Sequence, residues 1–103
     1  MTTATRLTSR DSYITVQADR ITDQSVDVLA VERAVNGELP AGITDAELAH
    51  AARVLAEHHI SRDESARRLR TTDYVLRKCQ DNGWKPDVIT SWRERMEKKA
   101  ARV

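Results

Sequence analysis

A run of cationic and hydroxyl side chains between residues 67 and 85 gives this sequence its clearest chemistry, the binding of a polyanion. Arginine and lysine pair with phosphate oxygens and with O6 and N7 of guanine. Hydroxyl groups donate to phosphates, and a carboxylate accepts from N4 of cytosine. The candidate contact residues are Arg67, Arg68, Arg70, Thr71, Thr72, Asp73, Tyr74, Arg77, Lys78, Asp81 and Lys85. Arg77 and Lys78 are the expected base-edge contacts.

Two short helices with a three-residue turn between them must position these side chains. Ser61 and Glu64 have the spacing of a capping box, in which a hydroxyl and a carboxylate each bind a free backbone N–H at a helix start. Thr72 is placed to cap a second helix that runs from Asp73 to about Asn82, with Gly83 as its stop. A short helix, a turn and a second capped helix over residues 62–82 predict a helix-turn-helix.

The apolar residues of this stretch fit the packing that such a unit needs. Two short helices that cross steeply require a small residue at the contact and apolar anchors one turn away. Ala66 meets the first requirement, and Leu69, Leu76 and Cys79 meet the second. The N-terminal part of the second helix enters the DNA major groove in this motif. A thiol on the inward face acts as a small hydrophobic group, so Cys79 is not expected to be a nucleophile.

Further helices are predicted on both sides of this unit. Val28, Val31 and Val35 share one helical face, which begins after Ser25 or Asp27 and ends at Asn36-Gly37. Thr44 and Glu47 form a capping box for a helix that reaches about His58. The last helix, over residues 87–102, repeats Ile89, Trp92 and Met96 at helical spacing. Trp92 and Met96 are interpreted either as core or as the seam of a homodimer.

The expected fold is all-α, with about five helices and a flexible or extended N-terminal arm. The arm covers residues 1–24, and the helical DNA-binding domain covers residues 25–103. Tyr13-Ile14-Thr15-Val16 is the one strand-like run, and the sequence indicates no partner for it. Arg6 and Arg10 are interpreted either as part of a disordered leader or as side chains that enter a minor groove.

The unit around residues 61–72 resembles bacterial helix-turn-helix proteins whose motif reads Ser-x-x-Glu-x-Ala-x-x-Leu-Gly-Val-Thr/Ser. The residues that match are Ser61, Glu64, Ala66, Leu69 and Thr72. Arg70 stands where the motif has its turn glycine, so a non-glycine residue must take the tight turn, with a positive φ as one option.

Residues 26–84 also resemble small helix-turn-helix proteins of actinobacteria and their temperate phages, through 30–37 and 43–48 together with the motif. The short members are similar to phage immunity repressors, which bind operators and silence lytic genes. Cro-like regulators, excisionases and host regulators share the motif. The resemblance therefore implies sequence-specific binding of double-stranded DNA, with repression at operators as the expected role.

The charge distribution agrees with a polyanionic partner. Residues 1–60 carry five Lys or Arg and nine Asp or Glu, whereas residues 61–103 carry twelve and seven, so the chain's net +1 hides a basic C-terminal part. Several other classes are not expected. Residues 1–10 lack the apolar segment of a signal peptide and no apolar run has the length of a membrane span, so we expect neither. The sequence shows no Ser/His/Asp or glycine-rich phosphate motif, and a single cysteine excludes an internal disulfide. The sequence predicts a cytoplasmic protein that is not an enzyme and needs no cofactor, metal or small-molecule substrate.

Two other functions remain open at this point. A DNA-bending accessory factor of the recombination directionality type would use the same motif at clustered, phased sites. A protein-interaction module could instead be built on a degenerate motif. Asp73, Asp81 and the missing turn glycine favour the interaction module, whereas Arg77 and Lys78 disfavour it.

Overall fold

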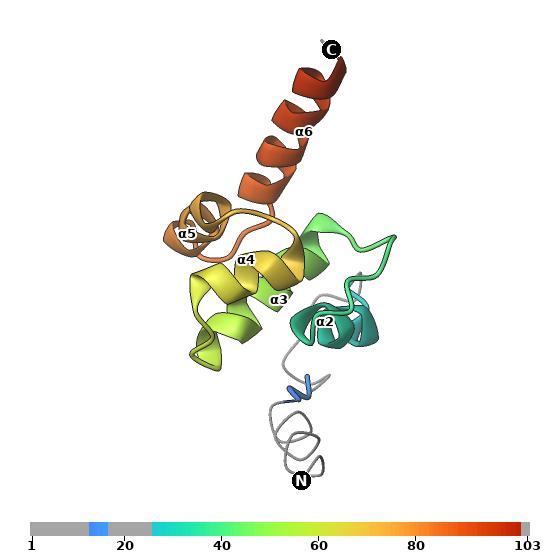
Figure 1. The fold of residues 1–103 in the computed structure, drawn as a ribbon, viewed down its shortest axis with the longest axis vertical. Helices are drawn as coiled ribbons and strands as arrows, with labels where there is room; N and C mark the ends of the chain where they lie inside the picture. The colour runs from blue at the N-terminus through green and yellow to red at the C-terminus, as the bar shows by residue number, and fades with distance from the viewer. Residues whose placement is uncertain (1–12, 17–25, 102–103) are drawn as a thin grey trace, which may run out of the picture.

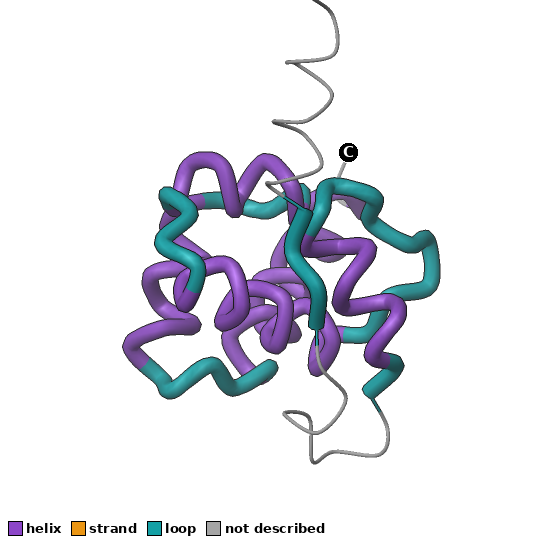
Figure 2. The backbone as a smooth tube through the Cα atoms, turned by 90° about the horizontal axis from the view of Figure 1, so that it is seen from below, coloured by secondary structure: helices purple, strands orange, loops and turns teal. Residues whose placement is uncertain are grey.

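A computed structural model of the chain describes residues 13–16 and 26–101. Five helices follow one another along the described residues, and none of these residues is in a strand, so the predicted all-α class is confirmed (Figure 1). The helices are α2 Val28–Val35, α3 Asp45–Glu57, α4 Arg62–Leu69, α5 Asp73–Asp81 and α6 Asp87–Ala101. Loops of three to five residues join α3 to α6 in sequence, and a longer loop of nine residues joins α2 to α3. Figure 2 shows these loops from the lower end of the molecule.

The helix starts lie where the capping residues predict them. Asp27 caps α2, Thr72 caps α5, and Thr44 with Glu47 forms a complete capping box on α3. At α4 the prediction is only half right. The Ser61 hydroxyl accepts from the Glu64 N–H at 3.2 Å, but the Glu64 carboxylate does not return to the Ser61 backbone. Two arginines of the same helix bind that carboxylate instead.

Four helices end in the same way, with a residue of positive φ and a backbone bond that spans five residues. The positive-φ residues are Gly37 and Gly83 after α2 and α5, and His59 and Arg70 after α3 and α4. At Arg70, where φ is 53°, the Thr71 N–H donates to the Ala66 carbonyl at 3.0 Å. The missing turn glycine has therefore not removed the tight turn. An arginine in the left-handed region makes it instead.

Helix α3 is the centre of the body and contacts each of the other four helices. Its buried face contains Ala49, Ala51 and Ala52 beside Leu48 and Leu55. Alanines keep the face flat, so the neighbouring helices can approach closely without large side chains between them. The chain has no Phe, and its fully buried large side chains are Leu, Val and Cys. The core is accordingly aliphatic.

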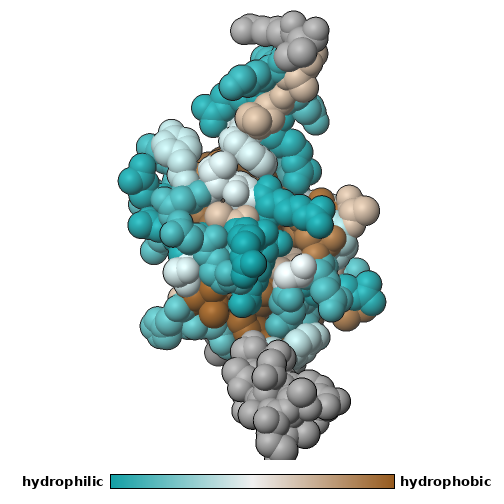
Figure 3. Space-filling view, viewed as in Figure 1, coloured by the Kyte–Doolittle hydropathy of each residue, from teal (hydrophilic) through white to brown (hydrophobic). Residues whose placement is uncertain are grey.

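Helix α6 projects from the body, and only its first turns are packed (Figure 1). Ile89 is buried and Trp92 packs partly against the core, whereas Met96 is 48% exposed. The core interpretation therefore holds for Trp92 and is wrong for Met96. The distal helix is mostly hydrophilic, with a paler strip along one side (Figure 3). No helix in the described part of the chain is long and apolar enough to cross a membrane.

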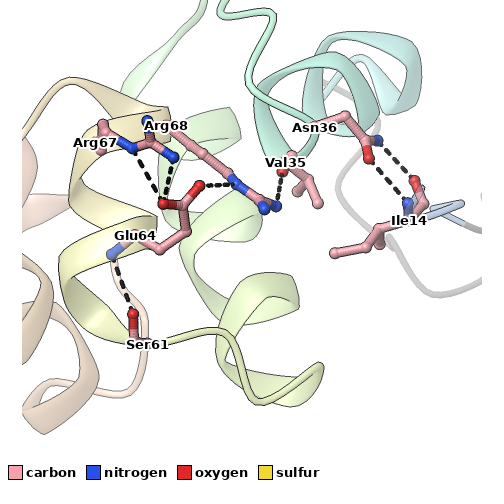
Figure 4. Close-up of polar contacts among 7 residues, drawn as sticks. All are labelled: Ile14, Val35, Asn36, Ser61, Glu64, Arg67 and Arg68. Carbon is pink, nitrogen blue, oxygen red and sulfur yellow. Dashed lines mark hydrogen bonds and ion pairs between the residues drawn. The ribbon is translucent and has the colours of Figure 1, made fainter. Parts of the chain in front are cut away.

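The extended segment 13–16 has a partner that the sequence did not indicate, namely α2. Ile14 and Val16 are buried in the core. The Asn36 side chain accepts from the Ile14 N–H at 2.9 Å and donates to the Ile14 carbonyl at 2.8 Å (Figure 4). Glu32 accepts from the Val16 N–H at 2.9 Å and from the Tyr13 hydroxyl at 2.6 Å. This part of the predicted arm thus belongs to the body, while Arg6 and Arg10 lie outside the described residues.

A buried carboxylate ties the starts of α2 and α3 together. Glu47 is 5% exposed. One of its oxygens accepts from the Asp27 N–H at 2.7 Å, and the other accepts from the Thr44 N–H at 2.9 Å. Asp27 and Thr44 are themselves the capping residues of the two helices. A single side chain therefore satisfies a backbone donor at each of two helix starts.

Substitution of this carboxylate should destabilise the fold. We expect Glu47→Gln to lower the free energy of unfolding by about 1–3 kcal/mol, because the amide offers one oxygen to two partly buried N–H donors. The measurement is urea denaturation followed by circular dichroism. Glu57→Gln is the matched control, because Glu57 is exposed and its carboxylate pairs only with Arg53. If Glu47→Gln lowers the free energy of unfolding no more than Glu57→Gln does, the stabilising role of the Glu47 carboxylate is contradicted.

Candidate nucleic-acid interface

Helices α4 and α5 and the turn 70–72 form a unit whose inner side is anchored as the sequence predicts. Ala66 and Leu69 of α4 are buried, and so are Leu76 and Cys79 of α5. Val75 adds a further anchor, since it is 1% exposed. The nine-residue α5 is thus fixed along one side, which leaves its opposite side free to face a partner.

The outward side of α5 carries two cations around one aromatic ring. With 100° per residue, Tyr74, Arg77 and Asp81 form the outermost line of this helix, and Lys78 flanks it. All four are exposed. The Arg77 guanidinium carbon lies 5.9 Å from the centre of the Tyr74 ring, and the Lys78 ammonium lies 5.6 Å from it. Both distances are in the range of cation–π attraction, so the ring helps to orient the predicted base-edge contacts.

Asp73 is held by an arginine that the sequence analysis did not select. The Arg62 guanidinium lies 3.1 Å from the Asp73 carboxylate, and both side chains are about half exposed. Asp73 is also the first residue of α5, where the helix macrodipole favours a negative charge. These two contacts give Asp73 a structural role and reduce its repulsion of phosphate. The spacing of eleven residues across a turn gives no signal for this pair in the sequence.

Arg67 and Arg68 bind the Glu64 carboxylate from the same helix (Figure 4). The Arg67 Nε–H donates to Glu64 at 3.0 Å and the Arg68 Nε–H at 2.8 Å. Arg68 is only 22% exposed, and its other guanidinium N–H donates to the Val35 carbonyl at the end of α2 at 3.0 Å. Arg68 therefore joins α4 to α2 and is poorly placed for phosphate. Arg67 keeps a largely exposed guanidinium.

The remaining candidates differ in how accessible they are. Arg70 and Lys85 are exposed, as is Thr72, whose hydroxyl oxygen accepts from the Val75 N–H at 3.2 Å. The Thr71 hydroxyl oxygen is buried and has no hydrogen-bond partner among the described residues, so it does not face a phosphate. Arg70, Arg77, Lys78 and Lys85 form no ion pair with a described residue. These four are the cations most available to a polyanion.

Cys79 and the histidines offer no sign of metal or thiol chemistry. The Cys79 thiol is fully buried and donates to the Lys85 carbonyl at 3.5 Å. Burial raises the pKa of this thiol, which keeps it protonated and unreactive. Among the described residues, no three His, Cys, Asp or Glu side chains lie close enough together to hold a metal ion. His58 and His59 instead lie at the end of α3.

Comparisons with protein-family models, with curated proteins and with solved structures found no match.

The strained turn should tolerate glycine better than arginine. A left-handed conformation costs an L-residue roughly 1–2 kcal/mol, and glycine takes it freely but gains entropy when unfolded. We expect Arg70→Gly to raise the free energy of unfolding by about 0.5–1 kcal/mol. Arg67→Gly, in the interior of the same helix, should instead lower it by about 1 kcal/mol. Urea denaturation of the two variants and the wild type measures both changes. A lower free energy of unfolding in Arg70→Gly as well as in Arg67→Gly would contradict the prediction.

The Glu64 contacts predict a dependence of stability on pH. Hydrogen bonds from Arg68 and then Arg67 hold the pKa of the Glu64 carboxyl below its usual value. Because the folded pKa is lower than the unfolded one, the resulting stability is present above the unfolded pKa and is lost as pH falls through the folded pKa. The Tm of Glu64→Gln should therefore lie below that of the wild type near pH 7, and the gap should narrow by about pH 3. A constant gap would contradict this.

Proposed function

We propose that the chain binds double-stranded DNA in a sequence-specific manner, with α4 and α5 as a helix-turn-helix and α5 in the major groove. The observation that carries this proposal is the outward side of α5, where Tyr74 lies between two exposed cations. A nine-residue helix is roughly 13 Å long, which suits a major groove about 12 Å wide. The opposite side of the helix is fixed to the core by three buried residues.

The electrostatics of the unit support the same proposal. Residues 61–85 carry seven Lys or Arg and four Asp or Glu. Two of the acids are already paired with arginines of α4, namely Asp73 with Arg62 and Glu64 with Arg67 and Arg68. Asp63 and Asp81 form no ion pair with a described residue, and Asp81 lies exposed at the end of α5. In the proposed complex Asp81 would accept from a cytosine amine, because its carboxylate would otherwise repel phosphate.

The contacts divide into two kinds by position. Arg77 and Lys78 lie on the outward side of α5, where a side chain reaches base edges, so they would supply sequence preference. Arg70 lies in the turn before α5 and Lys85 in the loop after it. These flanking cations would bind the phosphates on either side of the groove and supply affinity that is independent of sequence.

The finer role that we propose is repression by operator occupancy, in the manner of a temperate phage immunity repressor acting in the cytoplasm of its host. It rests on the resemblance of residues 26–84 described above. A recovered binding site placed across a bacterial promoter should lower reporter expression when the wild-type protein is produced. Expression that rises instead would favour an activator.

Selection from random double-stranded DNA at near-physiological salt, with sequencing of the retained pool, tests the proposal. A recovered motif supports it, and a palindrome would indicate a symmetric dimer. Clustered, phased sites with measurable bending would favour a DNA-bending accessory factor. No motif, with binding that vanishes as salt rises, would leave only unspecific attraction to phosphate and would refute the proposal in favour of a protein partner.

Two substitutions separate base contacts from phosphate contacts. Arg77→Ala should weaken binding to the selected site by about 1–3 kcal/mol and leave binding to unrelated duplexes nearly unchanged. Lys85→Ala should weaken both to a similar extent and reduce the dependence of affinity on salt. Fluorescence anisotropy at several salt concentrations measures these effects, with Arg53→Ala as an exposed control on α3. An Arg77→Ala variant with wild-type affinity for the selected site would contradict the assignment.

A further inference from the structure

A groove lies between the α4–α5 turn, the loop before α3 and the first turns of α6. Its volume is about 340 Å³, within the range of pockets that hold small ligands. The apolar part of its lining comes from several elements and includes Ile43, Leu69, Leu76 and Ile89, which are themselves largely buried. Trp92 of α6 adds a half-buried aromatic side chain. The groove therefore has an aliphatic base with an indole at its side.

The polar residues that line the groove are two arginines and a threonine, and none of the lining residues is acidic. Arg93 already forms an ion pair with Asp45, in which the Arg93 Nη1 atom lies 2.9 Å from the Asp45 Oδ1 atom. Arg70 is exposed and forms no ion pair with a described residue. The buried Thr71 hydroxyl oxygen has no hydrogen-bond partner among the described residues. An apolar base with one guanidinium that pairs with no described acid, that of Arg70, complements a ligand that has an apolar body and an anionic head.

We propose that this groove binds a small organic carboxylate, with the carboxylate on Arg70 and the apolar body against Trp92. A guanidinium and a carboxylate form paired, charge-assisted hydrogen bonds, which gives the head group a defined place. Arg70 is also a phosphate contact of the proposed DNA-binding surface. The ligand and DNA therefore compete for one guanidinium, and the ligand weakens DNA binding. This second part of the proposal depends on the proposed function, whereas the binding site does not.

A second copy of the chain is the other occupant to consider, and the exposed side of α6 argues against it. Beyond Trp92 that helix has one exposed large hydrophobic residue, Met96, and otherwise small or charged residues. Stable protein interfaces bury about 800 Å² on each partner around an apolar centre. One methionine with neighbouring alanines supplies much less apolar area than that. A small ligand fits the groove better than a second α6 does.

Titration of the ¹⁵N-labelled full chain with octanoate tests the binding site in the absence of DNA. We expect saturable shifts of the Trp92 indole N–H, while the indole of Trp84, which does not line the groove, serves as the internal control. Octanol, which has no charge, should bind roughly tenfold more weakly. Arg70→Gln should weaken octanoate binding to a similar degree, and Arg67→Gln should not. Ala41→Trp, at an exposed position of the rim, should block binding without unfolding the chain.

Three results would overturn the binding site. These are the absence of saturable binding, equal binding of octanol and octanoate, and a Trp92 shift that follows protein concentration without ligand. The last result, with a dimer in sedimentation, would assign the groove to a second copy. For the competition, octanoate should weaken DNA binding by the wild type and not by Arg70→Gln. Octanoate that binds without affecting DNA affinity would refute the competition. If the chain binds no DNA at all, the proposed function is refuted, and the octanoate titration still tests the ligand site by itself.

Discussion

The Glu47 carboxylate accepts from backbone N–H groups at the starts of α2 and α3 and so holds these two helices together. The other helices pack against this pair. Helix α3 then contacts all the other helices through a face rich in alanine. Arg68 adds a link from α4 to the end of α2, through the Val35 carbonyl. Removing one member of a buried hydrogen-bonded set leaves the others unpaired at the full cost of desolvation. Helix α5 packs on α3, α4 and α6 through its buried apolar residues, so its position follows from theirs.

Local signals in the sequence predict most of the fold, because helix ends are determined by residues within one turn. The hydroxyl and carboxylate caps at Asp27, Thr44 and Thr72 are such signals, and so is the glycine after α2. The inward side of α5 follows from the spacing of its apolar residues in the same way. The positive φ of Arg70 was foreseeable only as an option, because arginine, unlike glycine, does not favour that conformation.

Contacts between residues far apart in the chain explain what the sequence did not predict. The hydrogen bonds between the Asn36 side chain and the Ile14 backbone span 22 residues, and the bond from Arg68 to the Val35 carbonyl spans 33. Each depends on the final packing of two elements, and no short motif encodes it. The same is true of the candidate site, since the Arg62–Asp73 ion pair changes how the acid on α5 is interpreted. The sequence selected a candidate stretch of chain, and the structure shows which of its arginines are paired with acids.

Amide chemical shifts measured with and without a duplex test most directly whether the outward side of α5 binds DNA, as we propose. On addition of a mixed-sequence duplex at low salt, the largest shifts should fall in the turn and α5, over residues 70–81. The α2 amides near Asn36, on the far side of Arg68, should change little. Shifts that are confined to α2 or to the distal part of α6, with α5 unchanged, would contradict the account.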